Sequence, residues 1–386
     1  MSKKSKLFHT IVSLIVFPFI LFKLVWHKRN CYFIFPSWQI GGGERVHVDI
    51  LKAFKIFKPV CIITDVQYDK GIKTDFRNNA LMIYLWRWGT KKSFRKTMLK
   101  VLSKIINRNP NAFVFGSNNV FFYDLIPYLS PQVRIVDLTH SITPDRNWCE
   151  VLSLKTVDRF YKRIVLGEAA LQAFRQIYSE HNISPSYASH FQIIKNKVDS
   201  PSSVLEKSSE TGLEIIFVAR NSSEKRPRLV LEIARICKEK GLKTNFTIIG
   251  NFEEDYQMYA DFVHFAGTIR NKDVLNRYYK KAHLILITSI FEGFPMVLLE
   301  GMAYGAVPIS TAVGEIPYYV SEKLETGFLV ENDIDDLLVT RFVSIIEEIS
   351  NNPELLRNFS LNAMKLVRNN FSEALFEKSY TELLKN

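Results

Sequence analysis

Cysteine is scarce in this chain, whose 386 residues include only Cys31, Cys61, Cys149 and Cys237. These four lie far apart in the sequence, and no two of them form a CxxC pair. The spacing argues against a disulfide framework and against a structural zinc site. We therefore expect reduced, buried thiols of the kind found in cytosolic proteins.

The chain also lacks internal repeats, low-complexity tracts and the GxGxxG fingerprint of nicotinamide-binding proteins. Hydrophobic residues make up 47% of it, which is not the composition of a disordered protein. Its length exceeds what one ordinary core accommodates, so two domains are expected.

Acidic residues are sparse in the first half only. Residues 1–200 contain 30 Lys and Arg against 13 Asp and Glu, a net charge of +17, whereas residues 201–386 contain 21 against 26, a net charge of −5. The basic half suits an anionic partner such as lipid head groups, phosphorylated carriers or nucleic acid. No recognised nucleic-acid module is present, which favours an anionic membrane surface and no nucleic acid.

An apolar run near the start supports the same view. Fifteen of the twenty residues in 7–26 are apolar, and at ~1.5 Å per residue such a helix could span a bilayer. Pro18 and Lys23 interrupt the run, and basic residues flank both ends, so orientation stays open. Three placements remain: a spanning anchor, a hairpin-like or in-plane anchor, and a helix docked on the protein. We expect membrane attachment, because core helices are rarely this apolar all round.

Residues 91–108 are a second candidate for membrane contact. They include seven basic residues and no acidic one, and Lys92, Lys96, Lys100 and Lys104 follow one another at a helical spacing of four. A basic amphipathic helix is typical of proteins that bind anionic membranes. The alternative is a core helix with a solvated basic face.

Apolar runs alternate with helical patterns along the rest of the chain, which predicts parallel sheets covered by helices. The expected strands are 31–36, 60–66, 79–86, 111–117, 134–140, 163–168, 213–220, 244–250, 261–267, 284–289 and 306–312.

The Ser- and Lys-rich segment 196–212 predicts a linker between two Rossmann-like α/β domains. We place an acceptor-side domain at residues 31–200, after a membrane-associated segment at 1–30, and a donor-binding domain at 212–371. An amphipathic helix at 372–386 is expected to return to the first domain.

Two glutamates mark the sharpest candidate site. Glu292 and Glu300 are separated by seven residues, and a helix that begins near Pro295 would place Glu300 in its second turn. Glu292 then lies ahead of the helix N-terminus, in a loop that contains Gly293, Phe294 and Pro295 and whose free backbone N–H groups form an anion site. A sugar diphosphate needs this combination of amides for phosphate and carboxylates for hydroxyl groups.

This segment resembles the E-x7-E motif of the family 4 retaining glycosyltransferases, group 1 type, which have the GT-B fold of two Rossmann-like domains facing a central cleft. The residues EGMAYGAVPI that follow are similar to the family's E-A-M-A-x-G-x-P-V-I. The resemblance implies that Glu292 contacts the donor sugar and Glu300 the ribose. One departure is Glu315, which follows Gly314 where the family has the second Gly of its V-G-G-x-P turn.

A pair of cations forms the second element. Arg220 and Lys225 lie five residues apart across a polar turn and are similar to the family's G-R-x-x-x-x-K element. The resemblance implies that both hold the donor diphosphate, whose growing charge fixed cations stabilise. Arg226 is either a third phosphate contact or a surface charge, and we expect a surface charge.

A glycine loop and a histidine complete the resemblance. Gly42 and Gly43 stand in GGGER, which resembles the family's G-G-x-E-R loop, where glycine lets the backbone approach a ligand closely. His140 follows a predicted strand, and the resemblance implies a place beside the donor sugar and a catalytic role with Glu292. His47 could also point toward the cleft, but we expect a role on a helix face.

Neither a metal nor a cofactor is expected. Asp333 and Asp335 have DxD spacing, but they follow the donor motifs and suit helix capping and solvated charge better than metal binding. The co-substrate implied by the resemblance is a UDP- or GDP-linked sugar.

Together these features predict a retaining, metal-independent glycosyltransferase of cell-surface polysaccharide or glycolipid synthesis. It would act on a lipid-linked or saccharide acceptor at the cytoplasmic face of the cell membrane, because nucleotide sugars are made in the cytosol. The alternatives are a GT-B phosphorylase, a nucleotide-sugar epimerase, or an inactive membrane subunit that binds nucleotide sugars. The complete set of Arg220, Lys225, Glu292 and Glu300 favours the transferase.

Overall fold

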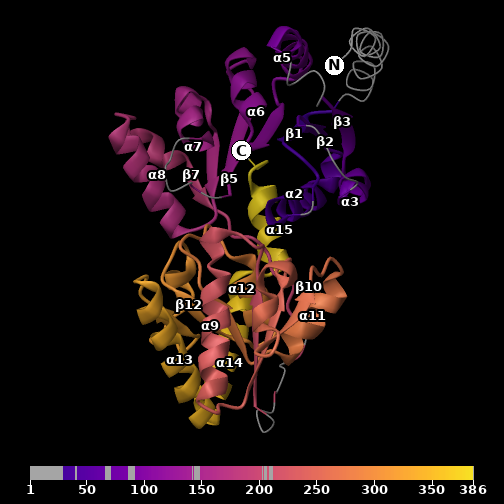
Figure 1. The fold of residues 1–386 in the computed structure, drawn as a ribbon. Coiled ribbons are helices and arrows are strands. Elements are labelled where there is room, and N and C mark those ends of the chain that lie inside the picture. The colour runs from indigo at the N-terminus through magenta and orange to yellow at the C-terminus, as the bar shows by residue number, and fades with distance from the viewer. Residues whose placement is uncertain are drawn as a thin grey trace. The chain divides into compact units, whose positions relative to one another are not determined.

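The computed structural model describes residues 29–39, 41–65, 71–85, 92–140, 142, 148–201, 203, 207 and 212–385. The chain divides into two units, each with its own sheet (Figure 1). The first unit takes the chain as far as Val165, then Ala173–Ile194 and Glu377–Asn386, and the second takes Leu166–Gln172 and Lys195–Phe376.

The predicted apolar helix at residues 7–26 lies outside the described residues. Among the residues that are described, no helix combines the length and the apolar character needed to cross a membrane.

The first unit is built on a seven-stranded parallel sheet in the order β3-β2-β1-β4-β5-β6-β7. Its strands are β1 (Cys31–Phe35), β2 (Val60–Ile63), β3 (Leu81–Tyr84), β4 (Phe113–Ser117), β5 (Arg134–Thr139), β6 (Lys162–Val165) and β7 (Phe191–Ile193). The helices between them are α2 (Gly42–Ala53), α3 (Lys73–Asn79), α5 (Lys92–Ile106), α6 (Val120–Leu125) and α7 (Cys149–Leu152).

The second unit contains a six-stranded parallel sheet in the order β10-β9-β8-β11-β12-β13. Its strands are β8 (Leu213–Val218), β9 (Thr244–Ile249), β10 (Val263–Gly267), β11 (Leu284–Ile287), β12 (Val307–Thr311) and β13 (Phe328–Val330). Its helices are α9 (Pro227–Glu239), α10 (Glu253–Tyr256), α11 (Lys272–Lys281), α12 (Met296–Ala303), α13 (Asp335–Asn351) and α14 (Pro353–Asn370).

Two further helices are divided between the units: α8 (Glu168–Glu180) and α15 (Glu373–Glu382) both begin in the second and end in the first. Within the first unit, the ring of Tyr380 contacts that of Phe115 at 6.1 Å, and the carbonyl of Leu384 accepts a hydrogen bond from Arg134.

The predicted fold class of two α/β domains with parallel sheets is confirmed, and every predicted strand is present. The strands that the sequence did not predict are β7 and β13, each three residues long and each at the edge of its sheet. The predicted linker begins with packed residues, since Asn196 and Val198 are buried and the N–H of Val198 donates to Phe371 O.

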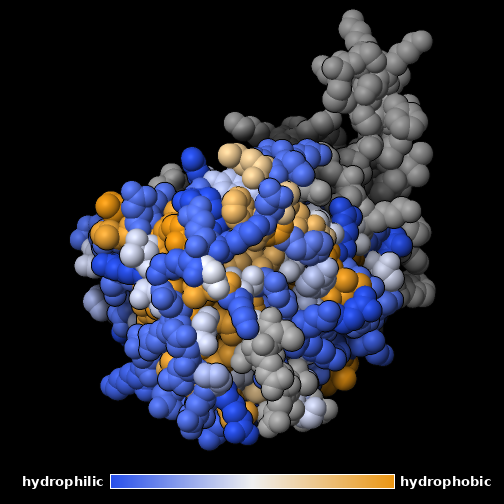
Figure 2. Space-filling model, turned by 60° about the horizontal axis from the view of Figure 1, so that its bottom comes forward, coloured by the Kyte–Doolittle hydropathy of each residue, from blue (hydrophilic) through white to orange (hydrophobic). Residues whose placement is uncertain are grey.

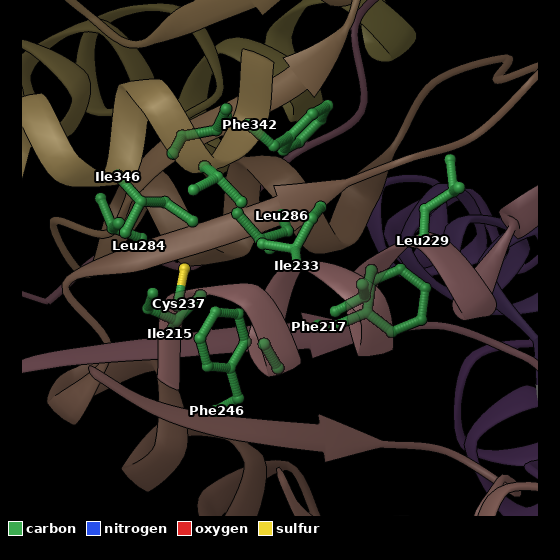
Figure 3. Close-up of a cluster of buried hydrophobic side chains, with 14 of the residues drawn as sticks. Ile215, Phe217, Leu229, Ile233, Cys237, Phe246, Leu284, Leu286, Phe342 and Ile346 are labelled. Carbon is green, nitrogen blue, oxygen red and sulfur yellow. The ribbon is translucent and has the colours of Figure 1, made fainter. Parts of the chain in front are cut away.

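Strand β11 shows how the second unit forms its core. All four of its residues are buried, with Leu284 and Leu286 on one face of the sheet and Ile285 and Ile287 on the other. A strand covered on both faces needs a continuous apolar run, and the LILI sequence supplies it. On the first face, Figure 3 shows side chains of α9 and α13 meeting those of β8 and β11.

The solvent-facing side of the protein has the opposite character. Figure 2 shows that hydrophilic side chains predominate on the face at the bottom of Figure 1, with apolar ones lying between them. Helix α5 follows the same division, because Met98, Leu102 and Ile106 are buried while Lys96 and Lys100 are exposed.

All four cysteines are free and buried, which confirms that none forms a disulfide. Burial raises the pKa of Cys31 to about 11 and that of Cys149 to about 12, so both thiols stay protonated near neutral pH.

A charged pair is buried in the sheet of the first unit. Asp137 on β5 and Arg163 on β6 are neighbours in register, and their Oδ2 and Nε atoms lie 3.0 Å apart. Tyr123 donates a hydrogen bond to Asp137 Oδ1 at 2.9 Å, and Arg163 donates one to Tyr178 at 3.1 Å. Burial raises the pKa of Asp137, while the guanidinium of Arg163 opposes the rise.

We predict that Asp137→Asn destabilises the first unit strongly, because it leaves the charge of Arg163 buried and unpaired, at a cost of about 3–5 kcal/mol. At roughly 2–4 °C per kcal/mol, the melting temperature should fall by about 10 °C. Asp137→Leu combined with Arg163→Met should melt higher than the single variant. Arg175→Met, at an exposed position of α8, is the control. Equal melting of Asp137→Asn and the wild type would contradict the prediction.

Candidate functional site

The candidate donor site lies in the second unit, at the carboxyl ends of two adjacent strands. β8 and β11 pair in parallel, so the loops that follow them leave the sheet at the same edge. Ligands of open α/β sheets bind at this edge. The first loop carries Arg220 and Lys225, and the second carries Glu292.

Backbone and side-chain hydrogen bonds fasten these loops together. The N–H of Ile290 donates to Glu224 O at 2.8 Å, and the hydroxyl of Thr288 donates to Lys225 O at 2.8 Å. In return, Arg226 donates through Nε to Thr288 O at 2.6 Å. The two predicted motifs therefore form one structural element, although the sequence presents them separately.

Lys225 and Glu292 meet directly across the loops. Nζ of Lys225 lies 2.6 Å from Oε1 of Glu292, and the two side chains are 19% and 11% exposed. Ser289 donates a second hydrogen bond to the same oxygen, also at 2.6 Å. A carboxylate and an ammonium so close and so little exposed form a strong, charge-assisted contact. The structure thus brings together two residues that were predicted for different parts of the donor.

Glu300 is held by an aromatic neighbour that the sequence did not identify. It lies in the second turn of α12, as predicted, and the hydroxyl of Tyr279 on α11 donates to its Oε2 at 2.9 Å. Gly293, Phe294 and Pro295 precede α12, and Pro295 occupies its N-cap position with extended backbone. The helix therefore starts where the predicted anion-binding amides require it to start.

Two arginines of the first loop have different surroundings. Arg220 is exposed, so its side chain can be reached from solvent. The side chain of Arg226 is 11% exposed and binds the carbonyls of Thr288 and Ser289. Our expectation that Arg226 is a surface charge is therefore wrong, because its guanidinium binds the carbonyls of the second loop and holds the two loops together.

Gly314 lies against the loop that carries Glu292. Its φ of 56° is left-handed, and a Cβ atom there would lie 1.9 Å from Glu292 O. Only glycine fits both the conformation and the contact. The turn after β12 consequently supports the backbone of the candidate catalytic residue.

The side chain of Glu315, the departure from the family pattern, contacts the segment Leu166–Gln172 of the same unit. It is 2% exposed, and its Oε1 accepts a hydrogen bond from the N–H of Ala170 at 2.9 Å, in the first turn of α8. Burial raises the pKa of Glu315, while the bonds from Ala170 and Ala169 oppose the rise. Its carboxylate thus caps a helix N-terminus.

The other predicted residues lie in the first unit and are described there by themselves. Gly42 and Gly43 open α2, and a Cβ atom on Gly43 would contact the ring of His140 at 3.6 Å. His140 follows β5, as predicted, and its Nε2 lies 2.9 Å from Nε2 of His47. Sequence reasoning missed His47 as a site residue, because its partner is 93 positions away.

The two aspartates with DxD spacing each form an ion pair with an arginine. Asp333 lies 3.6 Å from Arg341. Asp335, which is in the first turn of α13, lies 3.6 Å from Arg226. Over the described residues, no group of three or more His, Cys, Asp and Glu side chains is arranged to hold a metal ion.

Comparison with known proteins places this geometry in context. The family described as "Glycosyl transferases group 1" matches residues 204–366. A glycosyltransferase of Haemophilus influenzae is 22% identical over 352 residues, which cover 86% of this chain and 93% of that protein. The putative colanic acid biosynthesis glycosyltransferase WcaL of Escherichia coli is 33% identical over 143 residues, which cover 33% of this chain and 34% of WcaL.

Solved structures share the fold of the whole chain. Anabaena HepE, in complex with UDP, superimposes with a TM-score of 0.71 at 16% identity, covering 92% of this chain and 99% of HepE. The lipopolysaccharide outer core galactosyltransferase WaaB gives a TM-score of 0.69 at 17% identity, covering 92% and 99%. Residues 204–366 are therefore similar to the group 1 glycosyltransferases, and the chain has the two Rossmann-like domains of the GT-B fold. Assignment to family 4 and a retaining mechanism stay predictions.

We predict that Gly314→Ala disturbs the loop of Glu292. The added methyl group would overlap Glu292 O and occupy a left-handed backbone, so the melting temperature should fall well beyond the effect of backbone strain alone. Gly267→Ala is the matched control: Gly267 also has positive φ, at 66°, but a Cβ atom there meets nothing within 4 Å. The control should cost only about 1–2 kcal/mol, the usual penalty for an L-residue in a left-handed conformation. Equal losses in the two variants would show that the contact with Glu292 is unimportant.

Proposed function

We propose that this protein is a retaining glycosyltransferase that moves a sugar from a nucleotide diphosphate sugar to a saccharide or lipid-linked acceptor. The observation that carries the proposal is the contact of Glu292 with both Lys225 and Ser289 at the carboxyl edge of the sheet. This arrangement holds a cation for a diphosphate next to a carboxylate for sugar hydroxyls.

The ligand-free ion pair indicates how the donor would enter. A diphosphate offers Lys225 a more highly charged partner than Glu292, so Lys225 would turn to the phosphate, and Arg220 would join it. Glu292, still bound by Ser289, would then be free to accept hydrogen bonds from the sugar. Glu300, oriented by Tyr279, would bind the ribose hydroxyls.

During transfer, the bond between the anomeric carbon and the diphosphate oxygen breaks, and negative charge grows on the leaving nucleoside diphosphate. Lys225, Arg220 and the amides at the start of α12 would stabilise that charge, which is the largest contribution that fixed groups usually make. The oxygen of the acceptor hydroxyl forms the new bond to the same carbon, and its proton passes to the oxygen of the departing diphosphate. His140 is proposed to bind the donor sugar from the first unit.

A UDP-linked sugar is the favoured donor, because HepE binds UDP and UDP-glucose in complexes that share this fold. A role in cell-surface polysaccharide synthesis is supported by the colanic acid and amylovoran relatives and by the lipopolysaccharide transferase WaaB.

We predict that Lys225→Ala and Glu292→Gln each lower turnover of the donor by about 10²–10³-fold, because each removes a group that stabilises the transition state. The measurement is release of UDP or GDP from UDP-glucose, UDP-galactose and GDP-mannose, together with thermal stabilisation by each nucleotide. The exposed residues Lys281 and Glu348 give the matched controls Lys281→Ala and Glu348→Gln.

Turnover should persist in EDTA, because cations of the chain perform the role that a metal ion has in other transferases. Near-normal turnover in either site variant would remove that residue from the site, and loss of activity in EDTA would show that the reaction requires a divalent ion.

We also propose a location at the cytoplasmic face of the cell membrane. The apolar run 7–26 would supply one attachment, and the exposed lysines of α5 would supply electrostatic attraction to anionic lipid. Since the apolar side of α5 is buried in the unit, this helix would lie on the membrane surface without inserting.

We predict that a protein lacking residues 1–28 still binds vesicles containing anionic lipid at low salt, and that salt releases it. Charge reversal of Lys96, Lys100 and Lys104 to Glu should abolish this binding. The control reverses three exposed lysines of the second unit, Lys280, Lys281 and Lys323. Equal loss in both triple variants, or no binding by the shortened protein, would show that α5 has a solvated basic face and no membrane role.

A further inference from the structure

Two histidines from distant parts of the first unit share a hydrogen bond. Nε2 of His47, on α2, lies 2.9 Å from Nε2 of His140, which follows β5. The ring centroids are 4.9 Å apart with an interplanar angle of 52°. Each nitrogen can bond the other only if one carries a hydrogen and the other is bare.

The two rings have different surroundings. His47 is 3% exposed and stacks on Phe35, with ring centroids 3.9 Å apart and planes at 8°. Its Nδ1 is buried and, among the described residues, has no hydrogen-bond partner. His140 is only half-buried, and its Nε2 edge faces His47 and Gly43. The opposite edge of His140, with Nδ1, is therefore the edge that a ligand could reach.

Burial keeps both rings neutral. It lowers the pKa of His140 to about 4 and that of His47 well below its ordinary value. Each ring therefore carries a single hydrogen near neutral pH. The question that decides the chemistry is which nitrogen of each ring carries it.

The orphaned nitrogen of His47 answers this question. If His140 donated to His47, the hydrogen of His47 would sit on Nδ1, and a buried N–H would have no acceptor. If His47 donates, its Nδ1 is bare and no N–H is orphaned. Buried unpaired N–H groups are the rarer kind in proteins. The second arrangement makes Nε2 of His140 the acceptor and puts the hydrogen of His140 on Nδ1.

We propose that His47 is a positioning residue that fixes His140 in the tautomer with hydrogen on Nδ1, so that His140 meets the donor substrate as a neutral hydrogen-bond donor. The statement about the donor substrate rests on the proposed function, whereas the statement about the tautomer rests on the geometry of the pair. A neutral donor suits a sugar hydroxyl or a phosphate oxygen.

The test uses full-length protein labelled with ¹⁵N-histidine, in which the shift of each ring nitrogen reports whether it carries hydrogen. In the wild type we expect Nδ1 of His140 to be protonated and Nε2 to be bare. His47→Gln, whose amide N–H reaches the same place as Nε2 of histidine, should preserve this state. His47→Phe keeps an aromatic ring against Phe35 but has no donor, so His140 should become a mixture of both tautomers.

The activity arm compares the same proteins with UDP-glucose as probe. We expect kcat/KM to fall by about tenfold in His47→Phe, the loss of one positioned hydrogen bond, and to be largely preserved in His47→Gln. A residue with only a packing role would give the opposite order, with His47→Phe the better tolerated variant.

A bare Nδ1 on His140 in the wild type, or an unchanged tautomer in His47→Phe, overturns the proposal. If no protein, wild type included, turns over any nucleotide sugar, the proposed function fails, and the nitrogen shifts still decide whether His47 sets the tautomer.

Discussion

The contact between Lys225 and Glu292 joins two loops whose residues are 67 positions apart, and the second unit's site depends on it. This contact requires that β8 and β11 are paired, and the hydrogen bond from Arg226 to Thr288 O holds the two loops together. Pairing also solves an electrostatic problem, because neither charge is left buried and alone before a ligand arrives. A donor diphosphate would have to take the place of Glu292 as the partner of Lys225.

The first unit avoids a buried, unpaired charge in a different way, by keeping its histidine pair neutral. Its histidine pair is neutral because burial disfavours protonation, and the hydrogen bond between the rings uses a single hydrogen shared between the two Nε2 atoms. Just beneath it on β5, a full ion pair between Asp137 and Arg163 is buried in the sheet. The unit therefore buries one ion pair inside the sheet and holds a neutral histidine pair after β5.

Much of the fold was predictable from the sequence, because strands buried on both faces, such as β11, are continuous apolar runs that can be read directly. The three-residue edge strands β7 and β13 were not, since so short a run gives no periodicity. In the site, motif spacing located Lys225, Glu292 and Glu300 at one edge of a sheet. It could not give Ser289, Tyr279 or His47, because their roles depend on partners that only the folded chain brings near. The prediction for Arg226 was wrong because the carbonyls that its guanidinium binds, those of Thr288 and Ser289, are distant in the sequence.

Glu315 shows how the side chain at one position can restrict the residue at another. Its carboxylate occupies the space that a side chain at residue 167 would need: a Cβ atom there would lie 2.2 Å from Oε2 of Glu315. A larger residue at 167 would displace the carboxylate from the N–H of Ala170, so the contact restricts position 167 to glycine for as long as it is kept. The two positions should covary among relatives, and exchanging the turn of this chain for the V-G-G-x-P turn would release residue 167 from that restriction.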